Sequence, residues 1–172
     1  MNFFQINKKQ FLTIGVAKAW DFFSDPKNLC VITPDYMNFK IIHSDKRSIY
    51  PGQIIKYSVS PLLGIRMIWV TEITNVKKGS YFVDEQRFGP YSFWHHKHFI
   101  REVKNGVEIE DIVDYKVPYG FFGKLLHRLI IKSKLDGIFD YRYNKLHEIF
   151  GEYSKTDSYT RNENLKNYFQ QN

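Results

Sequence analysis

The segment 88–99 concentrates side chains that can perform acid–base or metal chemistry. It reads F-G-P-Y-S-F-W-H-H-K-H-F and contains three of the chain's six histidines, His95, His96 and His98. Side chains alternate between the two faces of a β-strand, so His96 and His98 share a face with Trp94, and His95 lies on the other. Two imidazoles beside large apolar groups indicate a ligand pocket, a metal site or a catalytic base.

A β-hairpin must hold these histidines in place. Asn105-Gly106 is a strong hairpin signal, because a type I′ turn requires positive φ at both central residues. We therefore expect antiparallel strands at 92–103 and 107–117. With these two residues as the turn, Arg101 faces Glu110, an opposite-charge pair that supports the register.

In the same register, the other face of the hairpin is apolar with a few polar groups. Asp111 lies diagonal to His98, and Tyr115 lies opposite His96. Buried polar groups require partners or water to offset their desolvation. The inner-face residues that we expect to contact a ligand are Trp94, His96, His98, Ile100, Ile109, Asp111, Val113 and Tyr115.

Three roles remain open for this polar group. In the first, which the sequence favours, the residues form a hydrogen-bonded network in a pocket wall. In the second, the residues orient a polar ligand or act on it as general acid and base, with His96, His98 and Asp111 as the catalytic candidates. In the third, the His-x-His pair binds a metal with Asp111 as third ligand. Asp84 or Glu85 joins the inner face, depending on the length of the turn before the histidines. We expect no metal and no other cofactor.

Turn residues divide the rest of the chain into short elements. Residues 3–14 are expected to form a first strand, and a short helix at 16–24 is followed by a second one before Pro34. Short turns then separate strand-like segments, which is typical of an antiparallel meander. These segments are 37–43, 53–60, 66–74, 81–88, 92–103 and 107–117.

A long amphipathic helix follows the strands. Apolar residues and one arginine recur near a 3.6-residue period from 121 to 150, and Gly151 is placed to end the helix. The positions on this stripe are Phe122, Leu126, Leu129, Leu135, Ile138, Phe139, Arg142, Leu146, Ile149 and Phe150. The sequence therefore predicts an α+β domain over residues 1–151, followed by a polar, flexible tail at 152–172.

Composition narrows the functional classes. The chain has 172 residues, a formal net charge of +7 and one cysteine, which excludes an internal disulfide framework and a cysteine-based zinc site. Its Lys and Arg residues are scattered, which argues against nucleic-acid binding. No segment resembles a signal peptide or approaches the roughly 18 apolar residues of a membrane span, so we expect a cytoplasmic protein.

The start of the long helix carries a group of basic residues: Lys124, His127, Arg128 and Lys132. Basic residues on an amphipathic helix can dock on anionic lipid headgroups. The solvated face of a helix that packs on a core explains them as well. The sequence thus leaves transient membrane contact open, and it does not indicate an oligomeric state.

Several segments resemble the START-like, or SRPBCC, superfamily. They are V-A-K-A-W-D-F-F-S-D-P-K-N-L at 16–29 with I-T-P at 32–34, F-V-D-E-Q-R-F-G-P-Y-S-F-W-H-H-K-H-F at 82–99, and D-I-V-D-Y-K-V-P-Y-G at 111–120. The resemblance covers residues 3 to 151 and is to a bacterial subgroup described as ligand-binding. It implies a helix-grip fold, in which a curved, seven-stranded antiparallel sheet wraps around the long helix and leaves a cavity between them.

By this resemblance, the strands line the cavity together with Phe122, Leu126 and Leu129 of the helix. Members of the superfamily bind lipids, hormones or polyketides, and only some catalyse reactions, so the fold does not settle the activity. We expect a non-catalytic protein that binds a small hydrophobic or amphipathic molecule, lipid-like or polyketide-like. The alternatives are a cyclase- or hydrolase-like enzyme that uses the inner histidines with Asp111, and lipid transfer at a membrane surface.

Overall fold

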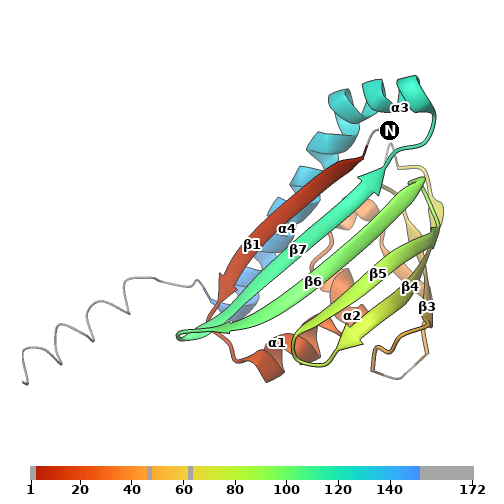
Figure 1. Cartoon of the computed structure of the whole chain (residues 1–172). Coiled ribbons are helices and arrows are strands. Elements are labelled where there is room, and N and C mark those ends of the chain that lie inside the picture. The colour runs from red at the N-terminus through yellow and green to blue at the C-terminus, as the bar shows by residue number, and fades with distance from the viewer. Residues whose placement is uncertain (1–2, 46–47, 62–63, 152–172) are drawn as a thin grey trace, which may run out of the picture.

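A curved antiparallel sheet with a long helix across one face dominates the structure (Figure 1). The computed structural model describes residues 3–45, 48–61 and 64–151. The predicted tail at 152–172 lies outside these residues. Within the described part of the chain, no helix has both the length and the apolar content required to cross a bilayer.

The strands follow the predicted segments to within a few residues. They are β1 (Phe4–Leu12), β2 (Lys40–His43), β3 (Gln53–Val59), β4 (Met67–Lys77), β5 (Tyr81–Phe88), β6 (Phe93–Val103) and β7 (Gly106–Lys116). The segment predicted as a strand at 37–43 forms only the short β2. It is preceded by a 3-10 helix, η1 (Asp35–Met37), which ends at Asn38 in the left-handed conformation and so interrupts the extended chain.

Neighbouring strands pair antiparallel in the order β1-β7-β6-β5-β4-β3-β2. Strands β2 to β7 are thus adjacent in sequence order, as a meander predicts. Because β1 pairs with β7, β1 and β2 are the opposite edges of the sheet. The helices α1 (Val16–Phe23) and α2 (Pro26–Val31) connect these edges, and the carboxylate of Asp25 caps α2 by accepting from the Lys27 N–H at 2.9 Å. The predicted helix-grip architecture is confirmed.

The β6–β7 hairpin differs from its predicted register by two residues. The turn is Lys104-Asn105 and not Asn105-Gly106, and Asn105 alone of these residues has a positive φ, 66°. Gly106 belongs to β7, where a Cβ would lie 2.1 Å from the carbonyl oxygen of Leu12. The C-terminal end of β1 thus approaches so closely that a glycine is required at this position. A shift of two residues leaves every side chain on its predicted face.

The C-terminal helix has three parts: α3 (Gly120–Leu126), the π-helical segment η2 (His127–Ile131) and α4 (Lys132–Phe150). Gly151 ends it with a φ of 84°, as predicted. α4 crosses one face of the sheet, whereas α3 lies beyond the end of the sheet at which β7 terminates (Figure 1). The residues of α4 buried in the core are Leu135, Phe139 and Leu146.

Two hydrogen bonds and a shared core hold α4 in place. Gln10 Nε2 donates to the carbonyl oxygen of Tyr143 at 2.8 Å, and Thr13 Oγ1 donates to that of Phe150 at 2.8 Å. These bonds join β1 and the residue after it to the far half of α4. Trp69 on β4 packs against both clusters of buried apolar residues that line the interior. The sheet and α4 therefore enclose the interior from two sides.

Candidate functional site

A cavity of about 180 Å³ lies between the inner face of the sheet and the helices α1, α2 and α4. This is many times the roughly 15 Å³ that a single water requires by the same measure. Its walls are mainly apolar and include Phe39, Ile55, Tyr57, Phe82, Trp94 and Phe139. One wall is different, because Asp84, His96, His98 and Arg142 lie there together.

Three adjacent strands bring this polar wall together. Asp84 on β5 pairs in register with His96 on β6, and His98 on β6 pairs with Asp111 on β7. All four side chains point inward because they occupy the same alternating positions. The sequence prediction had placed Asp111 diagonal to His98, and the two-residue shift of the hairpin places it directly opposite.

His98 is held between two carboxylates. Its Nε2 lies 2.7 Å from Asp84 Oδ2, and its Nδ1 lies 2.9 Å from Asp111 Oδ1. An imidazole donates to two carboxylates only when both nitrogens carry protons. Burial disfavours the charged ring, but the hydrogen bonds of Asp111 and Asp84 outweigh it and raise the pKa of His98. Two carboxylates at these distances thus favour the imidazolium form of His98.

His96 carries the opposite protonation preference. Its Nε2 lies 3.0 Å from Asp111 Oδ1, while its Nδ1 is 3.6 Å from Asp84 Oδ2, beyond hydrogen-bond distance. Burial and the adjacent charge of His98 lower the pKa of His96. His96 is therefore a neutral imidazole that donates from Nε2, and the two rings lie with centroids 3.7 Å apart.

Arg142 reaches the same wall from α4. Its Nη1 donates to Asp111 Oδ2 at a long 3.4 Å, and its guanidinium lies over the Phe139 ring at 5.1 Å. Its buried Nε has no hydrogen-bond partner among the described residues. A buried donor without an acceptor is costly, so Arg142 has hydrogen-bonding capacity left for a further group.

Asp84, His96, His98, Asp111 and Arg142 together are here called the inner network, and their charges cancel. The pKa of Asp111 is held well below its usual value, since hydrogen bonds from His96 and His98 and the charge of Arg142 outweigh burial. The pKa of Asp84 is lowered for similar reasons, with His98 as its main partner. Two carboxylates are thus matched by one imidazolium and one guanidinium, which is the condition under which buried charges are tolerated.

The inner network also contains a possible set of metal ligands. One ligand atom each from Asp84, His96 and His98 lies within 4.8 Å of the others. The sequence had suggested Asp111 as the third ligand, and the geometry favours Asp84. A divalent ion there would displace the proton of His98 and add positive charge near Arg142. The charges of the inner network balance without such an ion, while Arg142 Nε and His96 Nδ1 stay without a hydrogen bond among the described residues.

The structure divides the predicted ligand contacts on the strands into three groups. Trp94, His96 and His98 line the cavity. Asp111 lies behind the histidines, bonded to both of them. The remaining strand residues are buried in the core and do not line the cavity: Ile100, Ile109, Val113 and Tyr115.

The expectation that the start of the helix lines the cavity is corrected. Phe122 and Leu129 are 77% and 67% exposed, and Leu126 does not line the cavity. The helix residues that do so belong to α4, namely Leu135, Ile138, Phe139 and Arg142. The reason is that α3 extends past the end of the sheet, where none of the described strands faces it (Figure 1).

Tyr115 and His127 form a separate buried pair. The Tyr115 hydroxyl lies 2.7 Å from His127 Nε2, and the His127 ring stacks on Phe4 with centroids 3.5 Å apart. Burial and the charge of Lys132 lower the pKa of His127. His127 is thus a packed residue and not part of the predicted basic surface. Tyr115 pairs in register with Trp94, and His96 pairs with Val113.

Two residues of the inner network were not among the predicted ligand contacts. Asp84 was an open alternative to Glu85, and the register of β5 now places Asp84 inward and Glu85 outward. Arg142 belongs to the predicted stripe of the helix, and the sequence assigns it no ligand contact. The stripe contains one arginine among apolar residues such as Leu135 and Phe139. A charged residue on the face of a helix that points to the core is the sequence signal that could have identified Arg142.

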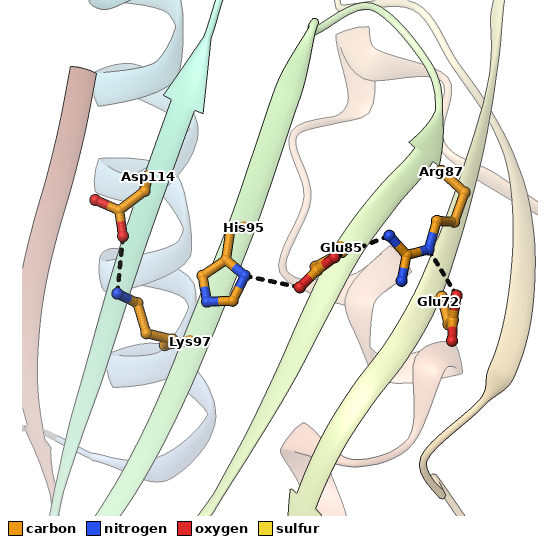
Figure 2. A network of polar contacts seen from close by, with 6 residues as sticks. All are labelled: Glu72, Glu85, Arg87, His95, Lys97 and Asp114. Carbon is orange, nitrogen blue, oxygen red and sulfur yellow. Dashed lines mark hydrogen bonds and ion pairs between the residues drawn. The ribbon is translucent and has the colours of Figure 1, made fainter. Parts of the chain in front are cut away.

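The outer face of the same sheet carries a row of ion pairs, here called the outer ladder (Figure 2). Its members are Glu72, Glu85, Arg87, His95, Lys97 and Asp114. His95 Nδ1 lies 2.9 Å from Glu85 Oε1, and Arg87 bonds to both Glu85 and Glu72 at 2.9 and 2.6 Å. A further pair joins Lys97 to Asp114 at 2.8 Å. These groups are partly exposed, and none of them lines the cavity.

Comparison with known proteins identifies the fold. No protein-family model and no curated protein matches the sequence. Among solved structures, the Zhui aromatase/cyclase of Streptomyces sp. R1128 superposes with a TM-score of 0.67 at 9% identity, over 84% of this chain and 92% of that one. Protein CV1439 of Chromobacterium violaceum gives 0.66 at 14% identity, over 87% and 99%.

A START superfamily protein of Mycobacterium smegmatis gives a TM-score of 0.58 at 10% identity, over 84% of this chain and 98% of that one. At such low identities the similarity is one of fold, and it extends over most of each chain. The fold is therefore START-like, in agreement with the resemblance of the sequence segments.

Proposed function

We propose that this START-like chain binds a small amphipathic molecule in the cavity, with the polar end of the ligand at Arg142. The observation that carries the proposal is the buried, unpartnered Nε of Arg142 on the wall of a cavity that is otherwise apolar. Pockets for small molecules combine apolar walls with a few placed polar groups in this way.

The apolar walls would supply most of the affinity. Burial of apolar ligand surface contributes roughly 25 cal/mol for each Å² removed from water. Aromatic side chains dominate the lining: Phe39, Tyr57, Phe82, Tyr91 and Trp94 are among them. Flat or unbranched apolar groups fit such walls, which supports a polyketide-like or lipid-like body for the ligand.

The polar wall would select the other end of the ligand. A guanidinium presents donors in a planar fork that matches a carboxylate, and such charge-assisted bonds are about twice as strong as neutral ones. His98 cannot serve as this donor because both of its nitrogens are bonded to Asp84 and Asp111. We therefore favour a carboxylate-bearing ligand oriented by Arg142.

Binding of an anion would be coupled to uptake of a proton. The inner network is neutral, so a carboxylate adds one buried negative charge. His96 Nδ1 has no hydrogen bond among the described residues and lies 3.6 Å from Asp84, so it is the nearest group that could accept a proton. Burial and the charge of His98 lower the pKa of His96, so affinity for the acid is expected to rise as the pH falls below 6.5 toward that lowered pKa.

The catalytic alternative has less geometric support. Three of the four nitrogens of His96 and His98 donate to carboxylates, and the fourth faces Asp84. A general base must reach the proton that it removes. A role for this pair in turnover stays a prediction, whereas a role in shaping and charging the wall follows from the bonds already present.

The first experiment asks whether the cavity holds an apolar molecule. Native mass spectrometry of the purified full chain, followed by organic extraction, should detect a retained ligand or the uptake of added dodecanoic acid. Dodecanol is the matched probe, since it has the same chain without the carboxylate. We expect the acid to bind at least about tenfold more tightly. Failure to take up either probe would contradict the proposal.

The second experiment assigns the preference to Arg142. Arg142→Met keeps a similar apolar stem and should bind the acid and the alcohol equally. Arg142→Lys keeps the charge beside Asp111 but lacks Nε, so it should fold and still lose most of the preference. Lys145→Met on the same helix is the control and should behave as wild type. An unchanged preference in Arg142→Lys would show that the polar end lies elsewhere.

A further inference from the structure

We propose that the start of the C-terminal helix docks on an anionic lipid bilayer. The docking surface, here called the α3 patch, consists of exposed apolar residues in and around α3 and η2: Tyr119, Phe121, Phe122, Leu125, Leu129 and Ile130. This proposal does not depend on ligand binding in the cavity. It gives a role to residues that the cavity does not use.

The α3 patch exposes more apolar side chain than a helix packed on a core. Tyr119 is 81% exposed, Phe121 75% and Phe122 77%. Single exposed apolar residues are common on protein surfaces, but a contiguous group of large ones marks an interaction site. The patch comprises six large apolar residues within the segment 119–130.

The fold fixes the patch in this outward orientation. On the inner side of the segment, Gly123 packs so closely that a Cβ would lie 1.8 Å from the carbonyl oxygen of Pro118. One helical turn later, the buried His127 bonds to Tyr115 and stacks on Phe4. A glycine and a histidine thus occupy the inward positions, and rotation of the large apolar residues into the core would break both contacts.

The charge around the patch favours an anionic partner. The sequence contains no Asp or Glu between Lys116 and Leu135. Lys124 and Arg128 are exposed and form no ion pair with any residue that the structure describes, while Lys132 pairs with Asp136 at 2.6 Å. Near an anionic membrane surface, each such basic residue raises the partition coefficient by about fivefold.

The dimensions favour a helix that lies in the headgroup region. Twelve residues form α3 and η2, seven and five respectively, which corresponds to a length of about 18 Å. This is too short to span the hydrocarbon core but sufficient for a shallow insertion of Phe and Leu side chains. Aliphatic and aromatic residues flanked by Lys and Arg are the composition that interfacial helices share.

The position of the helix in the fold allows such contact without rearrangement. α3 lies beyond the end of the sheet, so a flat membrane surface at this end of the molecule can contact α3 without contacting the faces of the sheet (Figure 1). The same end carries the exposed pair Phe3 and Phe93, whose rings meet edge to face at 5.2 Å. This end of the molecule is therefore apolar and basic at once.

The first test is flotation of the full chain with vesicles of phosphatidylcholine, with and without phosphatidylglycerol. Wild type should float with the anionic vesicles at low salt and much less at high salt. Phe121→Ser with Phe122→Ser should lower the partition coefficient by more than about tenfold. Lys124→Glu with Arg128→Glu should lower it by at least about tenfold on anionic vesicles. Ile149→Ser, at the other end of the same helix, should have no effect.

The second test reports insertion directly. Phe122→Trp places a fluorophore in the α3 patch, and Ile149→Trp places one on the exposed far end of α4. With brominated anionic lipids, we expect quenching and a blue shift for the added tryptophan of Phe122→Trp and neither for that of Ile149→Trp. Both variants keep an aromatic or apolar residue at an exposed position, so both should fold.

Three results would overturn the proposal. One is the absence of flotation with any vesicle. Another is wild-type flotation of the variant Phe121→Ser with Phe122→Ser. The third is a dimer in solution that these two substitutions dissociate while the vesicles bind neither form, since the α3 patch would then be an interface between two copies of the chain.

Discussion

His95 and His96 are neighbours in the sequence and lie on opposite faces of one strand, so they compare the two faces directly. His95 pairs with Glu85 on a face where both side chains keep more than a quarter of their exposure, 30% and 26%. His96 pairs with Asp111 where the two keep 6% and 9%. The same chemical pair is a weak surface contact on one face and part of a buried, charge-balanced wall on the other.

The difference teaches where polar groups are constrained. On the outer face, water can replace any partner that is lost, so exposed ion pairs contribute at most about 1 kcal/mol each. On the inner face, the loss of one partner leaves a charge without water or counter-charge, which costs several times more. Substitutions matched between the inner and outer faces of the strands test this contrast.

The largest effect is expected from removing a charge of the inner network. Asp111→Asn keeps the shape of the side chain but leaves His98 and Arg142 without their shared carboxylate. We expect the free energy of unfolding to fall by about 3–5 kcal/mol. The outer-face control Asp114→Asn, which loses the partner of Lys97, should fall by less than about 1 kcal/mol. Urea unfolding followed by circular dichroism measures both, and equal losses would refute the contrast.

The next effect is a dependence of stability on pH with a maximum near 6.5. The raised pKa of His98 means that its contribution is complete below 6.5 and is lost as the pH rises through the folded-state pKa. The lowered pKa of His96 has the opposite sign, so its contribution is present above 6.5 and is lost as the pH falls through its folded-state pKa. Unfolding free energies measured on both sides of 6.5 should therefore decline in both directions.

Substitutions assign the two limbs of this profile. His98→Gln should flatten the alkaline decline, and His96→Gln should flatten the decline just below 6.5. His95→Gln, on the outer face, should leave both in place. Long-range ¹H–¹⁵N spectra provide an independent readout, since His98 should show two protonated nitrogens at neutral pH and His96 one. A neutral His98 ring would contradict the charge balance.

At more acidic pH, the two inner carboxylates take over. Their folded-state pKa values lie below the ordinary 3.8, so their contribution is present above 3.8 and is lost as the pH falls through the folded-state values. Asp84→Asn should weaken this acid-induced loss, and Glu72→Gln on the outer face should change it little. Acid titration monitored by tryptophan fluorescence distinguishes them.

A smaller effect is expected on the outer ladder. Arg87→Gln removes the bonds to Glu72 and Glu85, and the free energy of unfolding should fall by less than about 1 kcal/mol at low salt. High salt screens exposed charges, so the difference from wild type should shrink further. A loss of several kcal/mol that resists salt would mean that the outer ladder is as constrained as the inner wall.

The smallest effect is expected from metals. Since the inner network balances its charges with protons, purified protein should contain less than one equivalent of Zn²⁺, Mn²⁺ or Fe²⁺ by elemental analysis, and a chelator should not change its thermal unfolding. A stoichiometric metal, lost together with stability on chelation, would instead establish Asp84, His96 and His98 as ligands.

Local patterns predicted the faces of the sheet because they depend on alternation alone. The sequence placed His96 and His98 inward and His95 outward, and a two-residue error in the turn did not change this. The register itself was not predictable from the turn. Asn105-Gly106 predicted a turn at these two residues, but Gly106 is required by the close approach of the backbone of Leu12, which is distant in sequence.

The helix shows the same limit. Its apolar period is nearly continuous from Phe122 to Phe150, and this continuity predicted that one face packs on the sheet throughout. Two features that the apolar period does not reveal interrupt this packing. The sheet does not extend as far as α3, and the π-helical segment 127–131 has more residues per turn, which rotates the apolar stripe around the helix. Residues at the start of the stripe therefore became the exposed α3 patch.

The pairing of the first strand with the last sets an order of folding. Phe4 pairs with Tyr115, and the bonds of Gln10 and Thr13 reach the end of α4. During synthesis, β1 stays unpaired until β7, the last strand before the C-terminal helix, has been made. Such distant closure slows folding and exposes a strand edge meanwhile. The cavity thus comes into existence late, and a nascent chain stalled before β7 would offer no site for any ligand.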